Sequence, residues 1–149
     1  MNVCSLSLQK KFMPRPLRKR TVSYPPKMLG FKPFGFFCEI EGRVQLQIDE
    51  FESIRLVNYQ MLTQEEAANE MKVSRPTFTR IYNGALKKLA QVIVDCKVLE
   101  IEGGEYEYNQ QWYRCKKCYK IIQGIHNHKK CNNCEDYGEN ELINLNTKK

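Results

Sequence analysis

The segment TQEEAANEMKVSRPTFTRIYNGALKKL, residues 63–89, constrains the fold more than any other part of this chain. Thr63 and Glu66 have the spacing of a capping box, in which the two residues satisfy each other's backbone amides at a helix start. Ser74 is a preferred N-cap type, and Pro76 falls in the first turn of the helix that would follow, where a missing amide proton costs little. The pattern predicts two short helices joined by a tight turn.

Both predicted helices have an apolar face for packing, because apolar residues recur at helical spacing. In the first helix these are the small or flexible residues Ala67, Ala68 and Met71, and in the second they are Phe78, Ile81, Ala85, Leu86 and Leu89. The opposite face of the second helix is polar. Two helices of this kind form a helix-turn-helix, in which the second helix lies in the major groove of DNA.

The polar side chains of the second helix are of types that contact nucleic acid. Arginine can bond in a bidentate manner to guanine and asparagine to adenine, while hydroxyl groups bond to bases or to phosphate. The candidates for DNA contact are Arg75, Thr77, Thr79, Arg80, Asn83 and Lys87. We expect Arg75, Thr77 and Arg80 to meet the bases. Lys87 and Lys88, about two turns on, are expected to contact phosphate or solvent. The alternative is a helical hairpin whose polar face is only solvated.

A third helix is predicted upstream of this pair. Asp49 and Glu52 repeat the spacing of a helix cap, and Phe51, Ile54 and Val57 follow at helical spacing. Three helices can enclose an apolar core that two cannot. We therefore expect a mainly α fold, a three-helix helix-turn-helix domain with a short β-hairpin and a small C-terminal zinc ribbon.

The stretches IDEFESIRLVNY, LTQEEAANEMKVSRPTFTRI and IEGG resemble the domain-of-unknown-function 134 family of predicted DNA-binding proteins, from about Met13 to Gly104. The Met-Pro-Arg-Pro start typical of that family falls at Met13, which makes Met13 a candidate start of the protein. VSRPTFTRIYNGALKKL is similar, more loosely, to the promoter-reading fourth region of sigma factors, which implies DNA contact only. Where the family usually has glycine in the turn, this chain has Lys72. If that position has positive φ, lysine costs on the order of 1 kcal/mol.

The net charge of +7 is concentrated near the N-terminus. Residues 1–48 hold nine Lys and Arg against two Asp and Glu, whereas residues 49–97 hold seven of each and residues 98–149 hold eight of each. The basic arm, residues 1–30, includes Arg15, Arg18, Lys19 and Arg20. Such an arm gains affinity by releasing counterions from phosphate, and it can enter the minor groove. The alternative is a solvated tail without a fixed partner.

Short strands are predicted before and after the helices of the helix-turn-helix domain, which spans residues 31–97. Val44, Leu46 and Ile48 alternate with polar residues, as in a strand. Two apolar stretches flank Gly103-Gly104, which predicts a β-hairpin or linker over residues 98–110. Its four glutamates would repel phosphate, so we expect it to pack or to act as a spacer. The aromatic residues Phe31, Phe34, Phe36 and Phe37 are expected to pack on the helical core as a loop rather than to stack on bases.

A second strong signal lies in the C-terminal segment, residues 111–149. Cys115 and Cys118, and after them Cys131 and Cys134, form two CxxC pairs separated by twelve residues. Four thiolates complete the tetrahedral coordination of Zn²⁺, which predicts a closed structural zinc site, a zinc ribbon, rather than catalysis. The alternatives are two disulfides, an iron–sulfur site, a reactive dithiol, or replacement of a cysteine by one of the histidines between the pairs, His126 and His128.

These observations together favour a cytoplasmic, sequence-specific protein that binds double-stranded DNA and regulates transcription, and no enzyme motif is found. Residues 1–12 lack the apolar core of a signal peptide, and no stretch is long enough to span a membrane. Dimerisation is expected because one helix reads few base pairs, and the zinc ribbon is a candidate site for a protein partner. The alternatives are an RNA- or protein-binding zinc ribbon module and, less favoured, a CxxC thiol redox protein.

Overall fold

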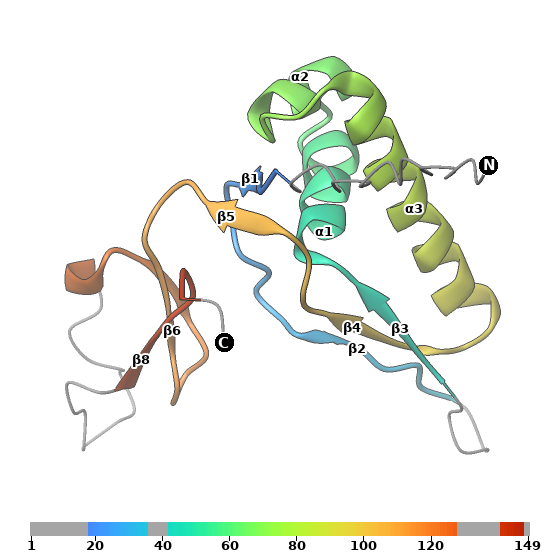
Figure 1. Ribbon diagram of the computed structural model, residues 1–149. Helices are drawn as coiled ribbons and strands as arrows, with labels where there is room; N and C mark the ends of the chain where they lie inside the picture. The colour runs from blue at the N-terminus through green and yellow to red at the C-terminus, as the bar shows by residue number, and fades with distance from the viewer. Residues whose placement is uncertain (1–17, 36–41, 128–140, 148–149) are drawn as a thin grey trace, which may run out of the picture.

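The computed structural model describes residues 18–35, 42–127 and 141–147. Within these ranges, three α-helices stand over a small mixed β-sheet, and an antiparallel sheet forms the C-terminal part (Figure 1). The helices are α1 (Ile48–Ile54), α2 (Gln64–Glu70) and α3 (Arg75–Val94), and α1 continues as the π-helix η1 (Arg55–Tyr59). The protein is therefore an α+β protein, and the expected mainly α class is wrong.

The strands form three separate sheets. Those before the helices are β1 (Arg20–Val22), β2 (Gly30–Phe31) and β3 (Arg43–Leu46). Those after α3 are β4 (Val98–Ile101), β5 (Tyr106–Tyr108), β6 (Trp112–Cys115), β7 (Ile121–Gln123) and β8 (Leu142–Asn144), with a short 3-10 helix η2 (Ile125–Asn127) after β7. The sheet orders are β1-β5, β2-β4-β3 and β7-β6-β8.

The starts of α2 and α3 confirm the local sequence signals. The Thr63 amide donates to Oε2 of Glu66 at 2.8 Å, and the Glu66 amide donates to Oγ1 of Thr63 at 3.3 Å. The bonds from Thr63 hold the pKa of Glu66 below its ordinary value. α3 begins directly after Ser74, its N-cap residue, with proline in its first turn, but the Ser74 side chain makes no capping hydrogen bond to the backbone. Lys72, in the turn between the helices, has φ of +53°, so this position does have the positive φ that favours glycine.

The expected cap of α1 is wrong. The helix begins at Ile48, and its N-cap is Gln47, whose amide donates to Oε2 of Glu50 at 2.8 Å. Asp49 and Glu52, which the sequence suggested as the capping pair, are instead buried inside the helix. The observed pair, Gln47 and Glu50, lies two residues upstream of Asp49 and Glu52. Glutamine is not among the preferred N-cap residues, so the sequence pattern favoured the aspartate. The predicted strand is confirmed for Val44 and Leu46, which lie in β3, but Ile48, the third residue of the pattern, is the first residue of α1.

The predicted hairpin around Gly103-Gly104 is also wrong. β4 is the central strand of its sheet, antiparallel to β2 and parallel to β3, whereas β5 pairs in parallel with β1. The two glycines carry the chain past the start of α1, where the Ile48 amide donates to the Gly103 carbonyl at 3.1 Å. A Cβ on Gly104 would lie 2.8 Å from Oδ1 of Asp49. Close approach to α1, rather than a two-strand turn, explains the glycine pair.

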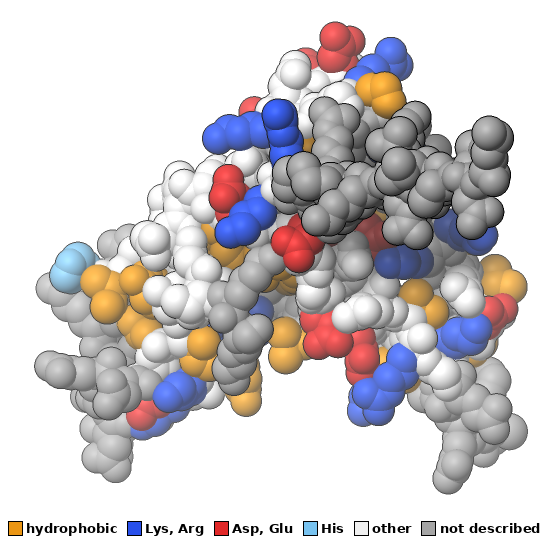
Figure 2. Space-filling model, viewed as in Figure 1, with side chains coloured by type: hydrophobic (Ala, Val, Ile, Leu, Met, Phe, Trp, Pro, Cys, Tyr) orange, Lys and Arg blue, Asp and Glu red, His pale blue; other side chains and the backbone are white. Residues whose placement is uncertain are grey.

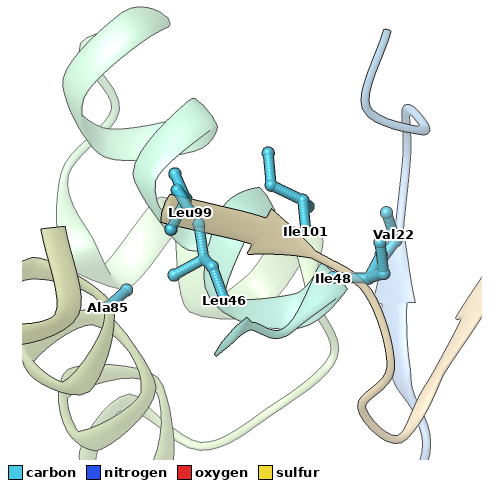
Figure 3. Close-up of a cluster of buried hydrophobic side chains, with 6 residues drawn as sticks. All are labelled: Val22, Leu46, Ile48, Ala85, Leu99 and Ile101. Atoms are coloured by element: carbon cyan, nitrogen blue, oxygen red, sulfur yellow. The ribbon is translucent and has the colours of Figure 1, made fainter. Parts of the chain in front are cut away.

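Two apolar clusters replace the single helical core that the sequence suggested. The first joins the sheet to α1 and α3, and its members are Val22, Leu46, Ile48, Ala85, Leu99 and Ile101 (Figure 3). The second lies among η1, α2 and α3, and its members are Leu56, Ala67, Ala68, Met71, Phe78 and Tyr82. Phe31 and Phe34 are 55% and 98% exposed, so the prediction that they pack on the core is wrong. Phe36 and Phe37 lie outside the described residues.

The C-terminal sheet is joined to the rest of the protein through the segment that follows β1. The rings of Tyr24 and Trp112 meet edge to face with centroids 4.9 Å apart, and Nη2 of Arg114 donates to the Pro26 carbonyl at 3.0 Å. Within this sheet, Cys115 and Ile122 are buried. No α-helix in the described part of the chain combines the length and the apolar character that crossing a bilayer requires.

Candidate nucleic-acid interface

The outward face of α3 carries four exposed polar side chains from the predicted set. They are Arg75, Arg80, Asn83 and Lys87. At 100° per residue, the last three fall on one stripe, opposite the buried Phe78, Tyr82 and Ala85. The core therefore orients the helix, and the first three turns of α3 present donors to the solvent.

The two threonines of the predicted set have partners within the protein. Thr79 is half-buried, and its hydroxyl donates to Oε1 of Gln64 at 2.9 Å, which ties α3 to the start of α2. The Thr77 hydroxyl lies 2.8 Å from the Ser74 hydroxyl at the helix start. Of the two contacts, only the bond from Thr79 connects the two helices. Thr79 is thus better described as a positioning residue than as a base contact.

Lys88, which like Lys87 was expected to contact phosphate or solvent, instead forms an ion pair within the protein. Its Nζ lies 2.6 Å from Oε2 of Glu50, which joins α3 to α1. α3 nevertheless carries four basic residues and no acidic residue in its twenty positions. Lys87, which lies about 100° around the helix from Lys88, stays exposed. The charge of the outward face is therefore positive.

The basic arm is fixed to the turn between α2 and α3. The Thr21 amide donates to the Met71 carbonyl at 3.1 Å, and Met71 is fully buried at the end of α2. Arg18 and Lys19, directly before β1, are exposed. Arg15 lies outside the described residues. Two of the predicted arm residues are therefore held next to the turn that precedes α3.

Arg20 has a structural role instead of the predicted DNA contact. Its side chain is 18% exposed, its Nη1 lies 3.6 Å from Oδ2 of Asp49, and it donates to the Glu105 carbonyl at 3.4 Å. Burial raises the pKa of the Asp49 carboxyl, and the neighbouring Arg20 partly opposes this. A guanidinium engaged with a buried carboxylate anchors β1 to α1 and has little freedom to contact phosphate.

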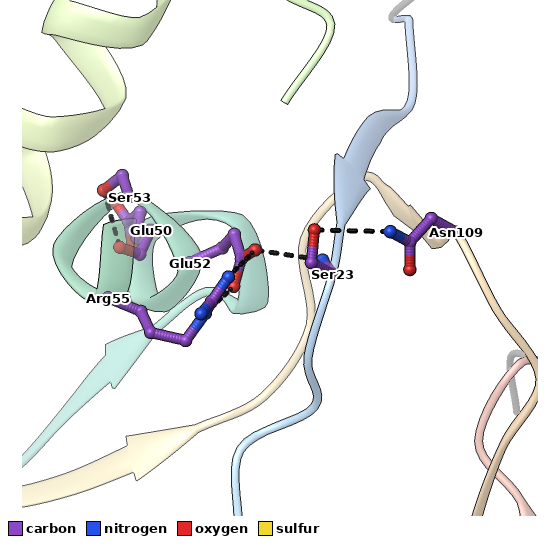
Figure 4. Close-up of polar contacts among 6 residues, drawn as sticks. All are labelled: Ser23, Glu50, Glu52, Ser53, Arg55 and Asn109. Carbon is purple, nitrogen blue, oxygen red and sulfur yellow. Dashed lines mark hydrogen bonds and ion pairs between the residues drawn. The ribbon is translucent and has the colours of Figure 1, made fainter. Parts of the chain in front are cut away.

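The buried carboxylate of Glu52 connects α1 to the end of β1 (Figure 4). The sequence had suggested a helix cap at this residue. Glu52 is fully buried; its Oε1 accepts the Ser23 amide at 2.9 Å, and its two oxygens accept Nη2 and Nε of Arg55, each at 2.7 Å. Nδ2 of Asn109 donates to the Ser23 hydroxyl at 3.3 Å. The i,i+3 spacing of Glu52 and Arg55 was visible in the sequence, but nothing local marked the pair as buried.

Acidic side chains gather on a different surface, over β3 and β4 (Figure 2). There Oε1 of Glu100 lies 2.5 Å from Nη1 of Arg43, and Nε2 of Gln45 donates to Oε1 of Glu102 at 3.2 Å. These residues form the outer face of the β2-β4-β3 sheet, away from the core. A polyanion is disfavoured at this face and favoured at α3.

The first CxxC pair lies in a tight turn after β6. Cys115, the last residue of β6, is buried, and Cys118 is exposed. The Tyr119 amide donates to the Cys115 carbonyl at 3.0 Å, and Tyr119 has φ of +57°. Cys131, Cys134 and His128 lie outside the described residues. Among the residues that are described, which include His126, no three Cys, His, Asp or Glu side chains are grouped to hold a metal ion.

Comparisons with known proteins agree with the sequence resemblance. The family described as "Protein of unknown function DUF134" matches residues 9–109. A UPF0251 protein of Halothermothrix orenii is 38% identical over 83% of this chain and 96% of its own length. UPF0251 proteins of Chloroherpeton thalassium and Caldicellulosiruptor bescii are 43% and 41% identical, over 71% and 74% of this chain and 70% and 77% of their own lengths. No solved structure matches the chain significantly.

Proposed function

Since the chain belongs to the DUF134 family, whose description assigns no activity, we propose its function from the geometry of α3: it binds double-stranded DNA in a sequence-specific manner and regulates transcription. The observation that carries the proposal is the outward stripe of α3. Arg80 and Asn83 are exposed on this stripe. The other side of α3 packs against α2, and α3 contains no acidic residue. These side chains are the types that read guanine and adenine in the major groove.

Two further features support the proposal. The turn before α3 is braced from outside by the bond from Thr21 to Met71, and the capping box at Thr63 fixes the start of α2. The same bond holds Arg18 and Lys19 beside the helix pair, where they can neutralise phosphate next to the site of base reading. The arm supplies affinity and α3 supplies specificity.

Selection from random duplexes, followed by gel shifts with the recovered sequence, tests the proposal. We expect a consensus site and binding that weakens steeply with salt. Arg80→Ala is expected to cost about 1–3 kcal/mol of binding free energy and to relax the preference at one base position. Arg43→Ala, on the acidic face of the sheet, is the matched control and leaves binding nearly unchanged.

Three results count against the proposal. The first is the recovery of no preferred sequence. The second is equal binding to RNA and DNA of the same sequence, which would favour an RNA-associated module. The third is an Arg80→Ala protein that binds like wild type while Arg43→Ala weakens binding, since this would place the interface on the sheet.

We also propose that Cys115, Cys118, Cys131 and Cys134 hold one structural Zn²⁺. The turn that joins β6 to β7 supports this, because it brings two cysteines three positions apart to one end of a small antiparallel sheet with a very small apolar core. Metal analysis of purified protein is expected to give about one zinc per chain. Chelation is expected to expose titratable thiols and to unfold the C-terminal sheet. Metal-free protein with the sheet intact would refute this site.

A further inference from the structure

A groove runs between the segment after β1 and the α1–η1 helix, away from α3. Its volume is about 610 Å³, within the usual range for small-molecule sites. Its apolar lining comes from both sides and consists of Tyr24, Pro25, Met28, Phe51, Ile54 and Tyr59. Met28 and Tyr59 lie at the solvent side, 43% and 84% exposed. An apolar groove of this size with exposed aromatic and thioether side chains is suited to an apolar ligand.

The charged groups of the groove are both cations, Lys27 and Arg55. Arg55 uses Nε and Nη2 for Glu52, and its third guanidinium nitrogen, Nη1, makes no hydrogen bond with any residue that the structure describes. Lys27 is exposed and forms no ion pair within the described ranges. The groove therefore offers hydrogen-bond donors to an anionic group, and no carboxylate is among its lining residues.

The charges limit the ligand to one negative charge. Glu52 already balances the charge of Arg55, so Lys27 is the one uncompensated cation of the groove. Tyr24 and Arg55 also line an adjoining hollow, where Glu70 of α2 would repel a second anionic group. The π-helix η1 supplies both Arg55 and Tyr59 to the groove, and π-helical turns occur frequently at functional sites.

We propose that this groove is a binding site for a small apolar monocarboxylate. The apolar body of the ligand lies against Phe51, Ile54 and Tyr59, and its carboxylate accepts hydrogen bonds from Nη1 of Arg55 and from the Lys27 ammonium. This site is separate from the outward face of α3. It adds ligand binding to the proposed DNA binding.

Calorimetric titration of the full-length protein tests the site, with indole-3-acetate and decanoate as probes and indole-3-acetamide as the uncharged counterpart of the first. At least one carboxylate is expected to bind with a Kd of about 1 mM or lower, the level that a ligand of this size reaches at ordinary efficiency. The amide of a binding acid is expected to bind about tenfold more weakly. The titrations contain no nucleic acid, so their outcome is independent of whether α3 binds DNA.

Two variants of exposed residues locate the site without threatening the fold. Lys27→Glu is expected to weaken carboxylate binding about tenfold, and Met28→Trp, which fills the groove, is expected to abolish it. Lys32→Glu is the matched control, because Lys32 is also exposed but lines a different hollow with Arg43 and Glu100. Absence of binding by both carboxylates overturns the proposal, as does binding that Lys27→Glu and Met28→Trp leave unchanged, or an effect of Lys32→Glu equal to that of Lys27→Glu.

Discussion

Replacement of Glu52 by glutamine tests whether the buried carboxylate holds β1 against α1. The carboxylate accepts three hydrogen bonds, two from Arg55 at 2.7 Å and one from the Ser23 amide at 2.9 Å. Glutamine keeps one oxygen, but its NH₂ group faces Nε of Arg55, and the charge that balances a guanidinium only 16% exposed is lost. Breaking a buried pair in this way costs about 3–5 kcal/mol, and the partial exposure of Arg55 favours the lower end, about 3 kcal/mol.

Urea unfolding followed by circular dichroism measures this loss. A change of about 3 kcal/mol corresponds to a decrease in Tm of roughly 6–12 °C for a chain of this size. The control is Glu100→Gln, because Glu100 pairs with Arg43 at 2.5 Å on the surface, with side chains 35% and 72% exposed. Its expected cost is about 1 kcal/mol or less. If Glu52→Gln costs no more than Glu100→Gln, the buried network does not stabilise the fold and our reasoning is refuted.

Three further predictions concern backbone and burial. Lys72→Gly is expected to raise the free energy of unfolding by about 0.5–1 kcal/mol, because φ of +53° favours glycine; an unchanged urea midpoint contradicts this. Gly104→Ala is expected to destabilise the protein by more than Gly35→Ala does, since both have positive φ but only at Gly104 would a Cβ lie 2.8 Å from Asp49. The pKa of Asp49 is raised on folding, mainly by burial, so its contribution to stability falls as the pH rises from about 4 through the raised value. Asp49→Asn should therefore gain stability relative to wild type as the pH is raised above about 4, and a constant difference in urea unfolding contradicts this.

The parts of the fold that the sequence predicted are those determined within one or two helical turns. The capping box at Thr63 and the start of α3 after Ser74 depend on neighbours at most four positions away. The apolar alternation around Val44 is also a local pattern, although β3 itself pairs with the distant β4. The positive φ of Lys72, at a position where the family usually has glycine, is equally local, because this angle is set by the tight turn between two helices. Local rules suffice where the structure is decided by local hydrogen bonds and sterics.

The remaining elements depend on pairing between distant segments. β4 lies between β2 and β3, which are more than fifty residues away in the sequence, and β5 pairs with β1 across an even longer separation. The sequence around Gly103-Gly104 fits both a hairpin and a crossing over α1, and only the distant partners decide between them. The burial of Glu52 has the same origin, because the Ser23 amide that it accepts belongs to the segment after β1.

The parallel pairing of β1 with β5 also explains why Arg20 cannot be grouped with Arg18 and Lys19. A basic run looks uniform in the sequence, yet the strand begins at Arg20, which turns its guanidinium toward Asp49 and the Glu105 carbonyl. The next amide, that of Thr21, donates to Met71 in the turn before α3. One end of the run is thus used to fasten the arm to the helix pair, and only the residues before that point are free to neutralise phosphate. Neutralisation of Arg20 should therefore reduce the stability of the protein first, whereas neutralisation of Lys19 should reduce the salt dependence of DNA binding without affecting the fold.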